Sequence, residues 1–288
     1  MRAVRHSNFV IVLAVMCVLG VSSWGTAAPS GGSPGVGIAP PGDGERVTFK
    51  SEDPAVKAPV PATMYLPHRA GPFPAVVLLH PCSGLQPSNY DWGRWLRNLG
   101  YVAILPDSFA PRHLHATCGS IDVKPGRQAL DSLGALVYLR SRPDIIPRKV
   151  AVMGWSHGGA ATLASVSPGL VRKIHPNGGP YQAAIALYPG CDGWKANRLT
   201  SPLLMLMGSD DDWAKPGPCV EHAKGLQAAG AAIEWKIYPG AMHAFDAPSV
   251  ERVVQIPGSG QTYHLRYDAA ATADVHTQVQ RFLGAHLQ

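Results

Sequence analysis

The chain carries little charge and has no apolar segment long enough to cross a membrane. Only 15% of its 288 residues are charged, and the 25 basic side chains are scattered without a basic run. Nucleic-acid-binding proteins usually gather lysine and arginine on one face, so we expect no nucleic-acid partner. The longest apolar run, residues 9–21, has about 13 residues, whereas a transmembrane helix needs about 20. With 46% hydrophobic residues, the chain can form one sizeable globular core.

Cysteine is also scarce, and its spacing does not fit a zinc site. One of the five cysteines, Cys17, lies inside the apolar run. The other four are Cys82, Cys118, Cys191 and Cys219. They are far apart, without the short spacings of zinc ligands, so we expect no metal. An even number of cysteines in an exported chain suggests two disulfide bonds, for which three pairings are possible.

The first 28 residues have the layout of a secretory signal peptide. Two arginines precede the apolar run, and small residues follow it at the expected cleavage site. The next stretch, PSGGSPGVGIAPPGDG, is a linker rich in proline and glycine. We therefore predict a signal peptide over 1–28, a linker over 29–44 and one globular domain over 45–288. The mature protein is expected to be periplasmic or secreted, with no stable membrane insertion after cleavage.

After the linker, strand-like and helix-like segments alternate. The strands are continuous apolar runs, which is typical of a mostly parallel sheet with helices covering both faces. Ligands of such sheets bind beyond the carboxyl ends of the strands, so the residues just after each strand are the candidate site. Strands are predicted at 45–49, 60–66, 74–80, 101–107, 149–155, 183–189, 202–208 and 233–239, and helices at 91–100, 126–142, 156–166, 219–230 and 271–287.

Ser156 lies at one of these strand ends, in the sequence VMGWSHGGAATL. A strand precedes it and a helix of small residues follows, which is the setting of a nucleophile elbow. Gly154 and Gly158 keep the sharp turn free of side-chain bulk. A second G-x-S-x-G match, at 31–35, falls in the linker, where no strand or helix can aim its serine. Ser156 is therefore the predicted nucleophile.

A catalytic serine needs a base and a carboxylate that orients the base. In elbow hydrolases these residues follow the serine in the order acid, then histidine. One predicted strand ends in SDDDW, which offers Asp210, Asp211 and Asp212, and the next is followed by GAMHAF, which offers His243. Three adjacent carboxylates cannot all face one imidazole, and this pattern alone leaves the choice among them open.

The oxyanion of acyl transfer needs two backbone donors. One is the amide after the nucleophile, on His157. The other is expected in the loop HPCSGL, where Pro81 has no N–H and Cys82 is the better candidate. We expect His80, at the start of this loop, to position the loop rather than to act as a base.

The segments VVLLHPCSGL, LPDSFAPR, GWSHGG, LMGSDDDW and YPGAMHAFD together resemble the dienelactone hydrolase family of α/β-hydrolases. The resemblance extends over about residues 46–286 and implies an α/β-hydrolase fold, with a mostly parallel central sheet and helices on both faces. The family's acid follows its strand as Gly-x-x-Asp, which selects Asp211, three residues after Gly208. Its histidine lies in a Tyr-Pro-Gly-x-x-His-x-Phe stretch, which selects His243.

The resemblance also bears on the cysteines and the nucleophile. It implies that Cys82 pairs with Cys118, and Cys191 with Cys219, because the members of each pair follow neighbouring strands. Dienelactone hydrolases proper use a cysteine nucleophile, and a serine there is more similar to the family's broader set of esterases. Pro81 replaces the glycine common after the family's histidine. In LPDSFAPR, we expect Asp107 and Arg112 to form a buried ion pair that holds loops together.

These observations predict an exported serine hydrolase that cleaves carboxylic esters through Ser156, His243 and Asp211 and an acyl-enzyme. The partner is a small-molecule ester, and no cofactor is implied. Two alternatives stay open: an amidase, peptidase or acyltransferase on the same triad, and a non-catalytic binding protein that keeps the fold. The natural ester and the oligomeric state do not follow from the sequence.

Overall fold

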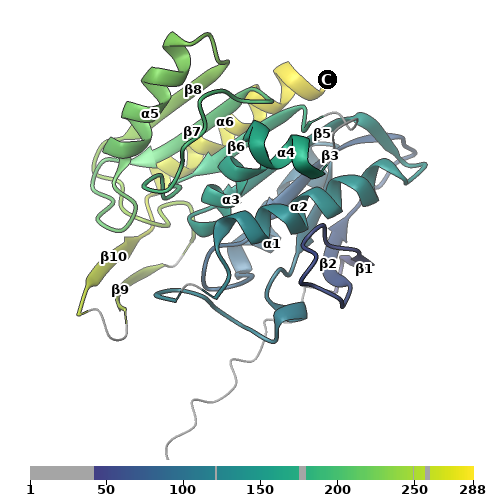
Figure 1. Ribbon diagram of the computed structural model, residues 1–288, viewed down its shortest axis with the longest axis horizontal. Coiled ribbons are helices and arrows are strands. Elements are labelled where there is room, and N and C mark those ends of the chain that lie inside the picture. The colour runs from purple at the N-terminus through teal and green to yellow at the C-terminus, as the bar shows by residue number, and fades with distance from the viewer. Residues whose placement is uncertain (1–41, 121, 175–179, 249, 257–259) are drawn as a thin grey trace, which may run out of the picture. The chain divides into compact units, whose positions relative to one another are not determined.

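A mostly parallel sheet of eight strands forms the centre of the computed structural model (Figure 1). The structure describes residues 42–120, 122–174, 180–248, 250–256 and 260–288, so the predicted signal peptide and most of the predicted linker lie outside the described residues. The strand order is β1-β2-β4-β3-β5-β6-β7-β8, with β2 antiparallel to β1 and β4 and the other pairs parallel. The strands are β1 (Glu45–Phe49), β2 (Val60–Tyr65), β3 (Phe73–Leu79), β4 (Val102–Pro106), β5 (Ile145–Trp155), β6 (Ala183–Leu187), β7 (Leu203–Gly208) and β8 (Ile233–Tyr238).

Helices cover both faces of this sheet, as the continuous apolar strands predict (Figure 1). Alternate strand residues enter one of two cores, since successive side chains of a strand point to opposite faces. One core packs the sheet against α2, α3 and α5, and the other packs it against α1 and α6. The helices are α1 (Pro87–Asn98), α2 (Pro125–Arg140), α3 (His157–Ser165), α4 (Pro168–Ile174), α5 (Pro216–Ala228) and α6 (Ala269–Leu287), with one 3-10 turn, η1 (Ala110–Arg112).

The register of the parallel strands brings their carboxyl ends to one edge. Gly154 of β5 pairs with Leu79 at the end of β3 and with Ala186 near the end of β6. Gly208, the last residue of β7, pairs with Tyr238, the last residue of β8. The loops that follow β3, β5, β6, β7 and β8 therefore lie along the same edge, where a parallel sheet binds its ligands.

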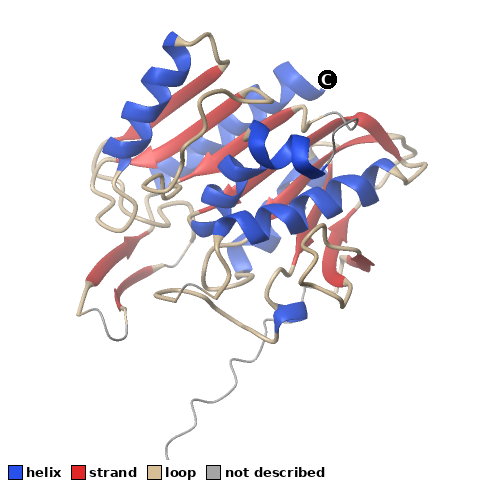
Figure 2. Ribbon diagram, viewed as in Figure 1, coloured by secondary structure: helices blue, strands red, loops and turns tan. Residues whose placement is uncertain are grey.

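The predicted α/β architecture is confirmed, and the structure adds elements that the sequence analysis did not predict. The main one is a separate two-stranded antiparallel hairpin of β9 (Glu251–Gln255) and β10 (Thr262–Arg266), between the His243 loop and α6 (Figure 2). The short helix α4 was also not predicted. None of the helices formed by the described residues is long and apolar enough to cross a membrane.

Candidate active site

Ser156 occupies a strained turn between β5 and α3. Its backbone has φ of 53° and ψ of −113°, a conformation that residues other than glycine rarely adopt. Neighbouring backbone comes so close that only glycine fits on either side of the serine. A Cβ on Gly154 would lie 2.2 Å from the carbonyl oxygen of Gly158, and one on Gly158 would lie 2.0 Å from that of Leu79. The two glycines of the motif thus permit the turn that presents Ser156 at the edge of the sheet.

His243 and Asp211 are aligned behind this serine. The Nε2 of His243 lies 2.9 Å from the Ser156 Oγ, and its Nδ1 lies 2.7 Å from the Asp211 Oδ2. Both side chains are almost fully buried. The other oxygen of Asp211 accepts hydrogen bonds from the backbone amides of Trp213 and Ala214, at 3.0 and 2.7 Å. With Asp211 fixed in this way, the Nδ1–H of His243 donates a hydrogen bond to the carboxylate, and Nε2 accepts one from the Ser156 hydroxyl.

The two neighbouring aspartates face elsewhere. The exposed Asp210 accepts a hydrogen bond from the hydroxyl of Ser209 at 2.6 Å. Asp212 accepts bonds from the backbone and ring nitrogens of His264, at 3.0 and 2.6 Å. The structure therefore brings only Asp211, of the three candidates, to the imidazole of His243.

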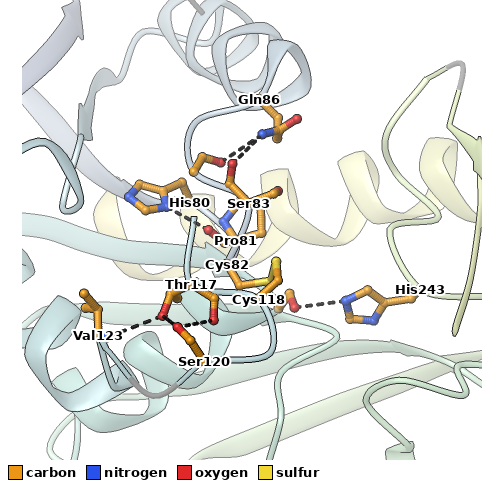
Figure 3. Close-up of a disulfide and its surroundings, with 12 residues drawn as sticks. His80, Pro81, Cys82, Ser83, Gln86, Thr117, Cys118, Ser120, Val123 and His243 are labelled. Carbon is orange, nitrogen blue, oxygen red and sulfur yellow. Dashed lines mark hydrogen bonds between the residues drawn. A yellow bond between two sulfur atoms is a disulfide. The ribbon is translucent and has the colours of Figure 1, made fainter. Parts of the chain in front are cut away.

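The two residues expected to donate to the oxyanion, His157 and Cys82, both line a cavity that contains Ser156. His157 is the first residue of α3, and the first amides of a helix have no acceptor within the helix. Cys82 lines the cavities that contain Ser156. Its loop is held by the disulfide to Cys118 (Figure 3) and by a 2.7 Å hydrogen bond from the Thr117 amide to the Cys82 carbonyl. The amide of Cys82 is thus carried by a loop that is tied down beside the serine.

The buried side chain of His80 positions this loop. Its ring donates from Nδ1 to the Pro81 carbonyl at 2.8 Å (Figure 3). Its Nε2 accepts a hydrogen bond from the Ser108 amide at 3.2 Å. Burial lowers the pKa of His80. Burial also lowers the pKa of His157, to about 4, and the neighbouring His80 acts in the same direction. Both rings are therefore neutral at pH 7, and neither reaches the reacting atoms through a hydrogen bond recorded for the described residues.

A fully buried carboxylate, Asp246, ties the histidine loop to the nucleophile strand. It accepts hydrogen bonds from the indole N–H groups of Trp92 and Trp155, both at 2.8 Å, and from the hydroxyl of Tyr188 at 2.6 Å. Trp155 directly precedes Ser156, and the Tyr188 ring meets the His243 ring edge-on, with centroids 4.7 Å apart. Burial raises the pKa of Asp246, although its three hydrogen bonds act the other way. Nothing in the sequence marks Asp246 as functional, since a buried aspartate in a loop has no pattern that distinguishes it from a solvated one.

The predicted ion pair between Asp107 and Arg112 was wrong, because Arg112 pairs with two other acids. The buried Arg112 guanidinium pairs with Asp53 at 2.9 Å and with Asp131 at 2.7 Å. Asp107 instead accepts the backbone amides of Phe109 and Ala110, at 3.1 and 3.0 Å. The five-residue spacing suggested a local pair, but the chain brings Asp53 and Asp131 from distant segments to the same guanidinium. The network holds loops, as expected, through different acids.

The second disulfide joins Cys191, after β6, to Cys219 in α5. Both cysteines are buried, in the core that lies between the sheet and α5. This bridge holds together the segments on either side of the β7 loop that carries Asp211. Within the described part of the chain, no group of three or more histidine, cysteine or acidic side chains could hold a metal ion.

Two cavities meet at Ser156. The larger, of about 1060 Å³, is lined by Ser156, His157, Cys82 and Trp213 together with residues of α2, α4 and the loop after β6. The smaller, of about 300 Å³, is lined by Ser156, His243, Tyr188 and residues of the β9–β10 hairpin. An open space therefore extends from the serine hydroxyl in two directions, which suits a substrate with two parts joined at the reacting bond.

Known proteins are similar to this chain in sequence and in fold. The dienelactone hydrolase family matches residues 60–287. A protein of Methylorubrum extorquens named "Putative carboxymethylenebutenolidase" is 26% identical over 199 residues, which is 65% of this chain and 68% of that one. A dienelactone hydrolase-like promiscuous phosphotriesterase from metagenomic libraries has a similar structure, with a TM-score of 0.64 at 20% identity, covering 85% of this chain and 98% of that one. Esterase 2 of Thermogutta terrifontis, phosphonylated by cyclosarin, has a TM-score of 0.63 at 18% identity, covering 86% and 95%.

Proposed function

Because the chain belongs to the dienelactone hydrolase family and is a hydrolase acting on ester bonds, we propose that it cleaves carboxylic esters through Ser156, His243 and Asp211. The observation that carries the proposal is the continuous hydrogen-bonded chain Oγ–Nε2 and Nδ1–Oδ2, at 2.9 and 2.7 Å, ending on a serine in a strained elbow. This geometry supports a serine nucleophile with its base and orienting acid.

In the first half of the reaction, the Ser156 Oγ attacks the ester carbonyl carbon while His243 Nε2 takes the serine proton. Asp211 stabilises the imidazolium that forms. The amides of Cys82 and His157 donate to the oxyanion of the tetrahedral intermediate, next to the positive end of α3. When the intermediate collapses, the ester C–O bond breaks, and His243 returns its proton to the departing alcohol oxygen.

In the second half, water attacks the acyl-enzyme while His243 accepts one of its protons. The collapse of the second tetrahedral intermediate breaks the bond to Ser156 and releases the carboxylic acid. The catalytic groups of both halves are side chains and backbone amides of this chain, and water is the second substrate.

The test is hydrolysis of short-chain p-nitrophenyl esters by the protein and by Ser156→Ala. We expect the variant to lose about 10⁴-fold in kcat, since removing a member of a working triad has effects of this order. A fluorophosphonate probe should label the wild type at Ser156 and leave Ser156→Ala unlabelled. Equal activity of the two proteins, or a probe bound at another residue, would refute the assignment.

We also propose that the protein is exported. Two disulfides favour an oxidising compartment, and the sequence of the first 28 residues supports a cleaved signal. Expression of the full chain in a bacterial host should yield an extracytoplasmic protein. Its intact mass should correspond to a chain that begins at residue 28 or 29. A cytoplasmic protein that retains Met1 would contradict export and leave the catalytic proposal untouched.

A further inference from the structure

The two cavities at Ser156 differ in which catalytic group they contain. The smaller one is lined by the imidazole of His243, whereas His157 and Ala160 of α3 line the larger one. In the proposed reaction, His243 must give its proton to the departing alcohol oxygen, so that oxygen lies at His243 Nε2. The alcohol part of the ester therefore extends into the smaller cavity. The acyl part, on the other side of the carbonyl carbon, extends into the larger one.

The cavities also differ in size and chemistry. The smaller one has a wall of small and aliphatic side chains, among them Ala247, Val254 and Leu265. Its volume of about 300 Å³ is at the lower end of the range for ligand pockets, and the volume of the other, about 1060 Å³, is at the upper end. A small alcohol in the smaller cavity and a bulky acyl group in the larger one fit these volumes.

The larger cavity is cationic. Lys124, Arg172 and Lys195, from three different segments, line it together with one carboxylate, Asp192. Among the described residues, none of the three cations forms an ion pair. Each is exposed, so each can reach a ligand without losing a partner.

The position of Lys124 is unfavourable in the absence of an anion. It is the N-cap residue of α2, whose first turn contains no acidic residue. A helix N-terminus carries a partial positive charge, so a lysine there is repelled unless a negative group lies nearby. Pro125 and Gly126, the first residues of α2, line the same cavity, so the positive end of this helix faces the space that holds the acyl group.

We propose that the substrate is a monoester of a dicarboxylic acid: its free carboxylate lies among Lys124, Arg172 and Lys195, and its esterified end lies at Ser156. The inference rests on the proposed function of Ser156 and His243. Water supplies a hydroxyl to the acyl carbon and a proton to the alcohol oxygen, and the ester C–O bond breaks. The products are a dicarboxylate and a small neutral alcohol.

The test compares matched esters. Mono(4-nitrophenyl) glutarate carries a carboxylate on the acyl side, and 4-nitrophenyl pentanoate has a neutral chain of the same length. After each rate is divided by that of hydroxide-catalysed hydrolysis, we expect kcat/KM for the glutarate to be about tenfold or more higher, as for an anion entering a cationic cleft. The preference should shrink as salt is added. Esters of 4-carboxyphenol, which place the carboxylate on the alcohol side, should gain less over phenyl esters than the glutarate gains over the pentanoate, because one cation, Arg252, lines the smaller cavity and three line the larger one.

Two variants should move the preference in opposite directions. Replacing Lys124, Arg172 and Lys195 together by glutamine should bring the ratio of the two kcat/KM values close to one, and Asp192→Asn should raise it. The matched control is Lys224→Gln, because Lys224 is an exposed lysine of α5 that lies outside the cavity. This substitution should leave the ratio of the two kcat/KM values unchanged.

Each outcome has a separate meaning. If the wild type hydrolyses the pentanoate and shows no preference for the glutarate, the inference fails and the serine esterase stands. If the 4-carboxyphenyl ester is the preferred one, the anion binds on the His243 side and the inference is overturned. If neither ester is hydrolysed and Ser156 is not labelled by the fluorophosphonate, the proposed function itself fails.

Discussion

At the scale of single residues, Asp246 shows how a charge far from the surface can organise an active site. Three neutral donors from α1, β5 and the loop after β6 converge on its two oxygens, and the three residues lie around the His243 loop. A buried carboxylate without a cation is costly, and the raised pKa of Asp246 expresses that cost. Its hydrogen bonds offset part of the cost, and they fix Tyr188 against the imidazole.

We expect Asp246→Ala and Asp246→Asn to behave very differently. Alanine leaves three buried donors without their acceptor, at about 1–3 kcal/mol each, so the free energy of unfolding should fall by several kcal/mol. Loss of the Tyr188 contact should also lower kcat about tenfold. Asparagine can accept from both indoles and donate to the tyrosine oxygen. The Asp246→Asn substitution removes the buried charge. At pH 7 the free energy of unfolding of this variant should therefore equal that of the wild type or exceed it by up to about 1 kcal/mol.

Chemical denaturation and p-nitrophenyl ester hydrolysis measure both effects. Asp274→Ala is the control, because Asp274 accepts a tyrosine hydroxyl in the same way, from Tyr238 at 2.8 Å, but lies at the surface beside Lys236. Loss of this exposed acceptor should cost less than about 1 kcal/mol. Equal destabilisation by Asp246→Ala and Asp274→Ala would show that the buried network contributes no more to the free energy of unfolding than a surface hydrogen bond does.

At the scale of elements, the β9–β10 hairpin is tied to both loops that carry the acid and the base. His264 bonds Asp212, next to Asp211, and the Arg266 amide donates to the His243 carbonyl at 3.3 Å. Tyr263 stacks on Trp213, with ring centroids 4.8 Å apart and an interplanar angle of 5°. Trp213 in turn lies 5.2 Å from the His243 ring. The hairpin therefore supports the imidazole through an aromatic stack as well as through backbone bonds.

Removing the outer ring of this stack should loosen His243 without unfolding the domain. We expect Tyr263→Ala to lower kcat about two- to tenfold, since an aromatic pair contributes about 0.5–1.5 kcal/mol. Tyr263→Phe keeps the stack and loses only a hydroxyl bonded to Gln261, so it should retain wild-type kcat. The melting temperature should hardly change in either variant. If phenylalanine and alanine lower kcat equally, the stack is not what supports the imidazole.

At the scale of the whole molecule, the features that follow from the order of residues along the chain could be predicted from the sequence. Contacts between segments far apart in the chain could not. Continuous apolar strands and an elbow motif predict that Ser156, the acidic run 210–212 and His243 lie along one sheet edge, and the family resemblance selects Asp211 from that run. The partners of Arg112 and of Asp246 come from segments far apart in the chain, so no local spacing signals them. The hairpin could have been found from its β-branched residues on either side of PGSG, but it packs as a separate sheet outside the alternating pattern.

The stability of the whole domain should fall in mild acid because three histidines are held neutral. Burial lowers the pKa values of His80, His157 and His276, that of His157 to about 4. In the unfolded chain a histidine binds its proton below about pH 6.5, so below that pH the unfolded state binds more protons than the folded one, and for His157 this difference persists down to about pH 4. The free energy of unfolding therefore decreases as pH falls through this window, by up to about 1.4 kcal/mol per pH unit for each histidine.

His276 provides the variant that tests this linkage, because it lies in α6, outside the proposed catalytic groups. Its ring stacks on Trp92, with centroids 4.1 Å apart and an interplanar angle of 6°, and phenylalanine can preserve that contact. His276→Phe does not titrate, so its unfolding free energy should fall less steeply than that of the wild type below pH 6.5. Urea denaturation at several pH values gives the two slopes, and contributions common to both proteins, including that of Asp246, cancel in their difference. Parallel slopes would mean that His276 takes up its proton in the folded protein as readily as in the unfolded chain.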